Sequence, residues 1–125
     1  MDAVSAPSRW ILLAHGSRLE AANQEVRSLA ARVAKKLGAR ILPAFLESAA
    51  PSLADALDQA IAEQARSISI LPYFLTQGRH LSEDIPKLIG EKRRAHPQVS
   101  IRLLDHIGNR EEIVDLLAEM ARTTR

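Results

Sequence analysis

The sequence predicts an α/β fold in which a four-stranded parallel sheet, with its strands in the order 2-1-3-4, lies between helices in a three-layer sandwich. Two observations lead to this prediction. Short apolar runs alternate four times with longer stretches in which apolar residues recur at helical spacing, and only a few residues connect them. The first and third runs are the most apolar, which favours central positions because central parallel strands are buried on both faces.

The first strand and the first helix have clear limits in the sequence. The continuous apolar run Trp10–Ala14 is typical of a buried strand. Apolar residues then recur every three or four positions from 19 to 37, and Gly38 is a natural end for this helix because glycine readily adopts the left-handed backbone. Ser17, followed three residues later by Glu20, predicts a capping box at the helix start.

The middle of the chain repeats the same pattern twice. Residues 40–46 form the second expected strand, and Pro43 places it at the sheet edge because proline lacks the N–H that a ladder needs. Pro51 predicts the opening of the second helix. The third strand is expected at Ser67–Pro72, and a third helix over Ser82–Ala95.

The last unit closes the fold. The fourth strand is expected at Val99–Leu104, where Arg102 indicates partial exposure and therefore a second edge. Asn109 and Glu112 predict another capping pair. The helix that follows carries a stripe of apolar residues, namely Ile113, Leu116, Leu117 and Met120.

Composition limits the class of protein. With 125 residues, 46% of them hydrophobic, the chain is expected to form a single domain over residues 9–125, preceded by a loose tail at residues 1–8. No apolar run approaches the ~18 residues of a membrane span, and no signal sequence is evident, so we expect a cytoplasmic protein. The absence of cysteine excludes disulfides and thiolate metal sites, and scattered arginines with 3% aromatic residues argue against nucleic-acid binding.

Three potential metal ligands follow three of the predicted strands. Ligands of open α/β sheets bind beyond the carboxyl ends of the strands, where the strand order reverses. His15 follows the first strand, Glu47 the second and His80 the third. Two imidazoles and a carboxylate suit cobalt, iron, nickel or zinc better than magnesium or calcium. Each residue also has a structural alternative, since a loop histidine can bond to backbone and Glu47 can favour a helix N-terminus.

Neighbouring residues are interpreted as structural. Gly16 permits a sharp turn, and Ser17 serves the helix start. His96 is expected at a helix C-terminus, and His106 follows the edge strand, apart from the other two. Glycine-rich phosphate loops and the G-x-S-x-G hydrolase motif are absent, which argues against a phosphate-binding loop and a hydrolase site, and no organic cofactor is expected.

Several ordered motifs resemble the small CbiX/SirB-type sirohydrochlorin chelatases. The resemblance covers about Trp10 to Ala121 and rests on Leu12-Leu13-Ala14-His15-Gly16-Ser17-Arg18, Ala44-Phe45-Leu46-Glu47, Leu71-Pro72-Tyr73-Phe74-Leu75, Gly78-Arg79-His80 and Asp84-Ile85-Pro86. It implies a chelatase fold, no need for ATP, His15 and His80 as catalytic and metal-binding histidines, and Glu47 as a further metal ligand. It also implies a homodimer, because the single-domain form is similar to family members that pair.

The sequence therefore predicts an ATP-independent enzyme that inserts a divalent metal into sirohydrochlorin, in cobalamin or siroheme biosynthesis. Cobalt is the first choice of metal substrate, with iron or nickel as alternatives. Arg18 and Arg79 flank the histidines in sequence and are candidates for contacting the carboxylates of this tetrapyrrole. Two other hypotheses remain open: a carrier of metal or tetrapyrrole that does not catalyse insertion, and an interaction module without site chemistry.

Overall fold

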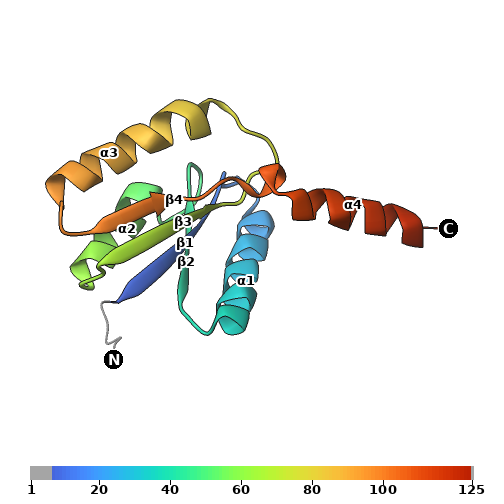
Figure 1. Cartoon of the computed structure of the whole chain (residues 1–125), viewed down its shortest axis with the longest axis horizontal. Helices are drawn as coiled ribbons and strands as arrows, with labels where there is room; N and C mark the ends of the chain where they lie inside the picture. The colour runs from blue at the N-terminus through green and yellow to red at the C-terminus, as the bar shows by residue number, and fades with distance from the viewer. Residues whose placement is uncertain (1–6, 125) are drawn as a thin grey trace.

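The computed structural model describes residues 7–124 and contains a parallel sheet with the strand order β2-β1-β3-β4 (Figure 1). The strands are β1 (Ser8–Ala14), β2 (Ile41–Phe45), β3 (Ser67–Pro72) and β4 (Ser100–Leu103). The helices are α1 (Glu20–Leu37), α2 (Leu53–Ala62), α3 (Ile85–Ala95) and α4 (Glu111–Thr123), with a π-helix η1 (His80–Asp84) before α3 and a 3₁₀ turn η2 (Ile107–Asn109) before α4. The predicted fold class and strand order are confirmed.

Strand β1 occupies the centre of the sheet, and its side chains alternate between two apolar clusters. Ile11 and Leu13 are fully buried in the larger cluster, which α2 and α3 cover. Leu12 points to the opposite face, where it packs with residues of α1. This alternation follows from the period of two in a strand, and it explains why every residue of the run must be apolar.

The two sheet edges are where the sequence predicts them. Pro43 lies in β2, which pairs on one side only, with β1. Strand β4 forms the other edge, and its Arg102 is exposed while the preceding Ile101 is buried. Strand β1 begins at Ser8, inside the segment predicted to be a loose tail, and residues 1–6 of that segment lie outside the described residues.

Helix α1 ends where the sequence predicts, but its start differs from the prediction. Gly38 ends α1 in the left-handed conformation, with a φ of 74°, and its N–H donates to the carbonyl of Ala34, as expected. The predicted capping box at the start of α1 is wrong, because neither Ser17 nor Glu20 caps it and the N-cap position is Leu19. Their side chains are engaged elsewhere in the turn, as described below.

The starts of α2 and α4 also differ from the sequence predictions. Helix α2 begins two residues after Pro51, because the hydroxyl of Ser52 accepts from the N–H of Asp55. The predicted capping pair at α4 is wrong, since Glu112 forms an ion pair with Arg110 at 3.0 Å instead. Asn109 donates its side-chain amide to Asp105 at 2.9 Å and so does not cap the helix either.

The third predicted helix is divided in two. The turn His80–Asp84 is a π-helix, and the α-helix begins only at Ile85. Pro86 has no N–H to donate to the carbonyl four residues earlier, so regular α-helical bonding cannot extend unbroken back to Ser82.

Helix α4 departs from the expected sandwich. It extends away from the sheet, and none of its described residues is buried (Figure 1). One face of the sheet is covered by α2 and α3, whereas α1 lies on the other, so only part of the second face is shielded. No helix among residues 7–124 is both long and apolar enough to cross a membrane.

Candidate functional site

The first candidate ligand stands at the carboxyl end of the central strand. His15 directly follows β1 and is exposed. Its ring meets the ring of Phe74 edge-on, with centroids 4.4 Å apart and planes at 64°. Phe74 follows β3 and is only 3% exposed, so its ring is a fixed support. The imidazole is therefore open to solvent while being held from one side by a core residue.

The turn after His15 brings the ends of β1 and β2 together. Gly16 has a φ of 90°, and a Cβ built on it would lie 1.7 Å from the carbonyl oxygen of Glu47. The N–H of Glu47 donates to the carbonyl of His15 at 3.0 Å. Glycine is required here for both reasons, the left-handed backbone and the close approach of two chains. The contact places the backbone of Glu47 beside that of His15.

A buried amide fixes the far side of the same turn. The side-chain oxygen of Asn23 accepts from the N–H of Ser17 at 2.9 Å, and its nitrogen donates to the carbonyl of Ser17 at 2.8 Å. Asn23 is 2% exposed and also donates to Glu20 at 3.2 Å. The hydroxyl of Ser17 accepts from the N–H of Leu19 at 3.0 Å. These bonds replace the capping box.

The pKa of the Glu20 carboxyl is lowered, first by the hydrogen bond from Asn23 and then by the one from Arg27. Arg27 also lies 2.8 Å from this carboxylate and stacks its guanidinium over the ring of Phe45, 5.1 Å from the centroid. The start of α1 is thus tied to the end of β2 by charge as well as by packing.

The second candidate histidine lies in the segment that follows β3, the strand beside β1. His80 begins η1, and π-helical turns of this kind occur frequently at functional sites. The side chain of His80 lies outside what the structure describes. Arg79, just before it, is highly exposed and lies 3.6 Å from Glu83. Arg18 is exposed beside the His15 turn, so both candidate cations face solvent in the loops at the carboxyl ends of the strands.

The structure brings some of the predicted ligands to one edge but describes no complete metal centre. His15, Glu47 and the backbone of His80 follow three adjacent strands, and Glu47 is exposed. Among the side chains that the structure describes, which exclude that of His80, no three histidine, aspartate or glutamate groups come together as metal ligands. His96 ends α3, as predicted, and His106 precedes η2 beyond the edge strand.

Two residues that support the site were missed in the sequence. Asn23 lies on the apolar stripe of α1 next to Ala22 and three residues before Val26, and a polar residue at such a position is a usable signal. Phe74 is one of two phenylalanines in a chain that is 3% aromatic, and it follows a strand at the edge where ligands are expected. Neither signal identifies the partner that each side chain contacts.

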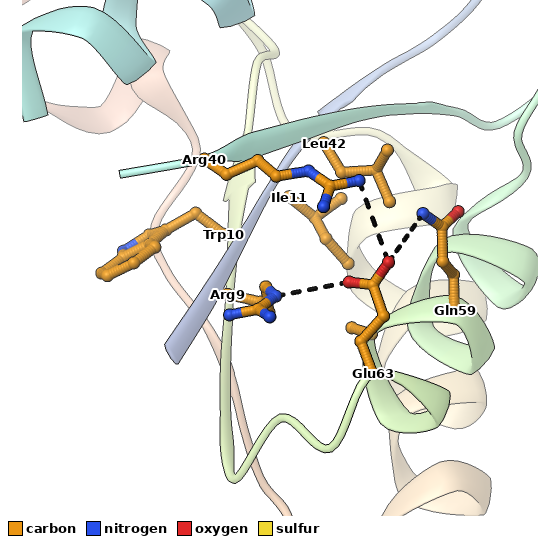
Figure 2. Close-up of a pocket in the computed structure, with 8 residues that line it drawn as sticks. Arg9, Trp10, Ile11, Arg40, Leu42, Gln59 and Glu63 are labelled. Carbon is orange, nitrogen blue, oxygen red and sulfur yellow. Dashed lines mark hydrogen bonds and ion pairs between the residues drawn. The ribbon is translucent and has the colours of Figure 1, made fainter. Parts of the chain in front are cut away.

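A charged pocket at the opposite end of the sheet has no room for a ligand. Figure 2 shows Glu63 between Arg9 and Arg40, at 3.4 and 3.8 Å, with the amide of Gln59 donating at 3.3 Å. The pKa of Glu63 is lowered, chiefly by the Gln59 and Arg9 hydrogen bonds. The cavity measures about 10 Å³, barely the space of one water molecule. This cluster joins the start of β1 to the end of α2.

Comparison with known proteins places the chain among sirohydrochlorin chelatases and their relatives by similarity. The chain is 31% identical over 125 residues to a sirohydrochlorin ferrochelatase of Priestia megaterium, covering 99% of this chain and 45% of that one. It is 28% identical over 120 residues to a sirohydrochlorin cobaltochelatase of Methanococcoides burtonii, covering 89% of this chain and 92% of that one. The chain spans about half the length of several curated relatives, among them the Priestia protein at 45% and a chloroplastic sirohydrochlorin ferrochelatase of Arabidopsis thaliana at 48%.

A solved structure is also similar to this chain. A cobalamin (vitamin B12) biosynthesis CbiX protein from Marinobacter aquaeolei VT8 superposes with a TM-score of 0.76 at 30% identity, covering 94% of this chain and all of that one. The family model for CbiX matches residues 9–124, which is nearly the whole chain. The chain therefore belongs to the CbiX family.

Proposed function

We propose that this chain is an ATP-independent chelatase that inserts a divalent metal into sirohydrochlorin, with cobalt as the first choice and iron or nickel as alternatives. The observation that carries the proposal is His15, exposed at the carboxyl end of the central strand with its ring supported by Phe74, in a chain of the CbiX family. Relatives named as ferrochelatases and cobaltochelatases support the reaction class and leave the metal open.

The chemistry asks for groups that bind a metal and accept protons. The tetrapyrrole loses two N–H protons as the divalent ion enters, so one ion is exchanged for two protons. A neutral imidazole can ligate the incoming ion or accept a proton near neutral pH. We assign these two tasks to His15 and His80, and we assign Glu47 to partial neutralisation of the metal's charge.

The positive side chains at this edge suit a substrate with many carboxylates. Arg18 and Arg79 are exposed in the loops that follow β1 and β3. We propose that they contact carboxylate groups around the rim of the macrocycle, as the bidentate geometry of arginine allows. The flat centre of the macrocycle then lies over the histidines.

The test is metal insertion itself. Anaerobic sirohydrochlorin is mixed with Co²⁺, Fe²⁺ or Ni²⁺, and its absorbance is followed with and without catalytic amounts of protein. We expect His15→Ala and His80→Ala to slow insertion by roughly a hundredfold or more, the scale of a lost acid–base group. His96→Ala, at the end of α3, is the matched control and should retain the wild-type rate.

The other hypotheses give different results in the same assay. A carrier would bind one equivalent of metal or tetrapyrrole without accelerating insertion. Wild-type rates in both histidine variants would contradict the assigned site. The metal with the highest acceleration is the one that the isolated protein inserts best among the three.

We also propose that the working unit is a homodimer. Helix α4 exposes Val114, Leu116, Leu117 and Met120, each between 53% and 59%. Beside α1, the half-covered sheet face holds an apolar groove of about 530 Å³, whose apolar lining includes Leu12, Leu29, Val33, Leu71, Leu104 and Ile107. Full burial of a leucine-sized side chain contributes roughly 1.5–3 kcal/mol, and these α4 side chains, each little more than half exposed, can contribute about half of that at an interface.

A second copy of this chain offers an occupant whose apolar surface and charge complement the groove and its surroundings. Its α4 supplies an apolar stripe, together with four acidic side chains and a single arginine. Helix α1 exposes the basic side chains Arg32, Lys35 and Lys36. We therefore propose that each copy's α4 occupies the groove beside the other copy's α1, an arrangement with two-fold symmetry.

Because the chain has no cysteine, an engineered pair reports on this interface directly. Val33→Cys combined with Leu117→Cys should form a disulfide-linked dimer, whereas Glu91→Cys, on α3 across the sheet, combined with Leu117→Cys should not. Light scattering should give twice the 13.8 kDa mass, and Leu117→Glu should shift it towards the monomer. A wild-type monomer at working concentration, active at full rate, would refute the dimer.

A further inference from the structure

We propose that Asn23 is a positioning residue, which holds the His15–Ser17 turn in the shape that presents His15 to the metal. The inference rests on the proposed function. Asn23 belongs to α1, eight residues along the chain from His15, and it is 2% exposed. It is a buried polar side chain that contacts this turn through Ser17.

The hydrogen bonds of Asn23 are directed at a single backbone unit. Its amide oxygen accepts from the Ser17 N–H at 2.9 Å, and its amide nitrogen donates to the Ser17 carbonyl at 2.8 Å. The second amide hydrogen is directed to the Glu20 carboxylate at 3.2 Å. The side chain thus pairs with Ser17 as a neighbouring strand would, but from within a helix.

Only an amide supplies this set of contacts. A carboxylate can accept from the N–H but cannot donate to the carbonyl, and a hydroxyl is too short to do both. A buried donor or acceptor without a partner is unfavourable, so loss of the amide would leave the Ser17 backbone groups unsatisfied or make the turn move.

The turn is held at both ends. At one end, Glu47 donates its backbone N–H to the His15 carbonyl at 3.0 Å. At the other end, Asn23 is hydrogen-bonded to the backbone of Ser17. The intervening Gly16 has a φ of 90° and no side chain that could restrict the backbone of the turn. Without the hydrogen bonds from Asn23, the glycine turn could adopt other backbone conformations, and we expect these to change the orientation of His15 relative to Phe74.

The experiment compares Asn23→Ala with a matched control on the same helix. Ala30→Gly alters a residue that is 1% exposed two turns further along α1, away from the turn. Both variants should lower the melting temperature. We expect Asn23→Ala to weaken binding of Co²⁺ alone, measured by calorimetry, by about tenfold, as is typical for outer residues that orient a metal ligand. Ala30→Gly should stay within about twofold of wild type.

A second readout does not depend on metal. Spectra of ¹³C-labelled histidine report the ring environment of His15, whose signal His15→Ala identifies. This signal should move in Asn23→Ala and not in Ala30→Gly. If Asn23→Ala fails to fold, Asn23→Asp combined with Glu20→Gln serves instead, with Glu20→Gln alone as its reference. The pair keeps an acceptor for the Ser17 N–H and removes the donor to the Ser17 carbonyl, and it avoids placing two carboxylates side by side.

The outcomes separate this inference from the proposed function. If His15→Ala weakens Co²⁺ binding and Asn23→Ala leaves both the binding and the His15 signal unchanged, the positioning role is wrong and the site stands. If His15→Ala binds Co²⁺ as wild type does, the proposed site is wrong, and the His15 signal alone then decides whether Asn23 holds the turn. Equal effects of Asn23→Ala and Ala30→Gly would reduce Asn23 to a general stabilising residue.

Discussion

The imidazole of His15 and the ring of Phe74 meet edge to face, 4.4 Å apart, at the point where β1 and β3 end. One partner is exposed and the other is in the core, so a buried residue orients a side chain that faces solvent. Such support restricts the imidazole before any ligand arrives, which lowers the entropy that must be lost when a metal binds.

Replacement of Phe74 should therefore affect binding more than a comparable core change does. Phe74→Leu removes the ring contact, and aromatic pairs of this kind contribute about 0.5–1.5 kcal/mol, which corresponds to roughly a twofold to tenfold weaker affinity for Co²⁺. The affinity is measured by calorimetry. Ile68→Val, in the buried part of β3, is the control and should change stability without changing affinity. Equal affinities for Phe74→Leu and wild type would mean that the ring contact does not orient His15.

Glu47 should matter less than either histidine. Glu47→Gln keeps the backbone contact with His15 and removes one exposed negative charge, a change of about 1 kcal/mol at most, or roughly fivefold. The metal concentration for half-maximal insertion should rise by that factor, and the saturated rate should change little. Initial rates over a range of metal concentrations check this, with the exposed Glu91→Gln on α3 as the control. A saturated rate as low as that of His80→Ala would contradict the ranking.

Gly16 should tolerate no side chain. A Cβ there would lie 1.7 Å from the Glu47 carbonyl oxygen, and the φ of 90° adds strain. We expect Gly16→Ala to lower the free energy of unfolding by roughly 3 kcal/mol or more, measured by urea denaturation. Gly90→Ala should do the opposite and stabilise α3 by about 0.5–1 kcal/mol, because only an ordinary contact at 3.5 Å surrounds it. A neutral Gly16→Ala would show that the two loops separate easily.

The carboxylate of Glu20 gives stability that depends on pH. Its pKa is lowered from the usual 4.5, first by Asn23 and then by Arg27. A lowered pKa in the folded state means that the stabilisation is fully present above the unfolded value and is lost as the pH falls through the folded value. Glu20→Gln should therefore have a lower melting temperature than wild type at neutral pH, and the difference should shrink below about pH 4. A difference that is the same at neutral pH and at about pH 3 would contradict this linkage.

Local pattern was enough to predict much of this fold. The strand order follows from which runs are wholly apolar and from Pro43. A strand buried on both faces needs apolar residues throughout, and a proline is tolerated only at a sheet edge. The end of α1 at Gly38 was equally local, since it depends on the backbone freedom of one residue. The sequence also predicted which three candidate ligands follow neighbouring strands.

Only the tertiary structure decided how the ends of these elements are bound. The spacing of Ser17 and Glu20 satisfies the rule for a capping box, yet the buried amide of Asn23 bonds the Ser17 N–H that the Glu20 carboxylate would bond in such a box. The same amide also bonds the Ser17 carbonyl, a contact that the capping box does not offer. The close approach of Gly16 to Glu47 joins residues 31 positions apart, which no local pattern contains.

In helix α4, too, the sequence predicts the element and tertiary contacts decide where it lies. Its apolar stripe was readable in the sequence, because a period of 3.6 residues is a local property. Where that stripe is buried depends on whether the connection after β4 turns back onto the sheet or leads away from it. In this structure η2 is locked in place, since the N–H of Gly108 donates to the Phe74 carbonyl at 3.0 Å and a Cβ on Gly108 would meet the Leu75 backbone. That contact between distant loops directs α4 away from its own sheet, so the sequence by itself determined an amphipathic helix and the tertiary structure determined that its apolar face is left exposed.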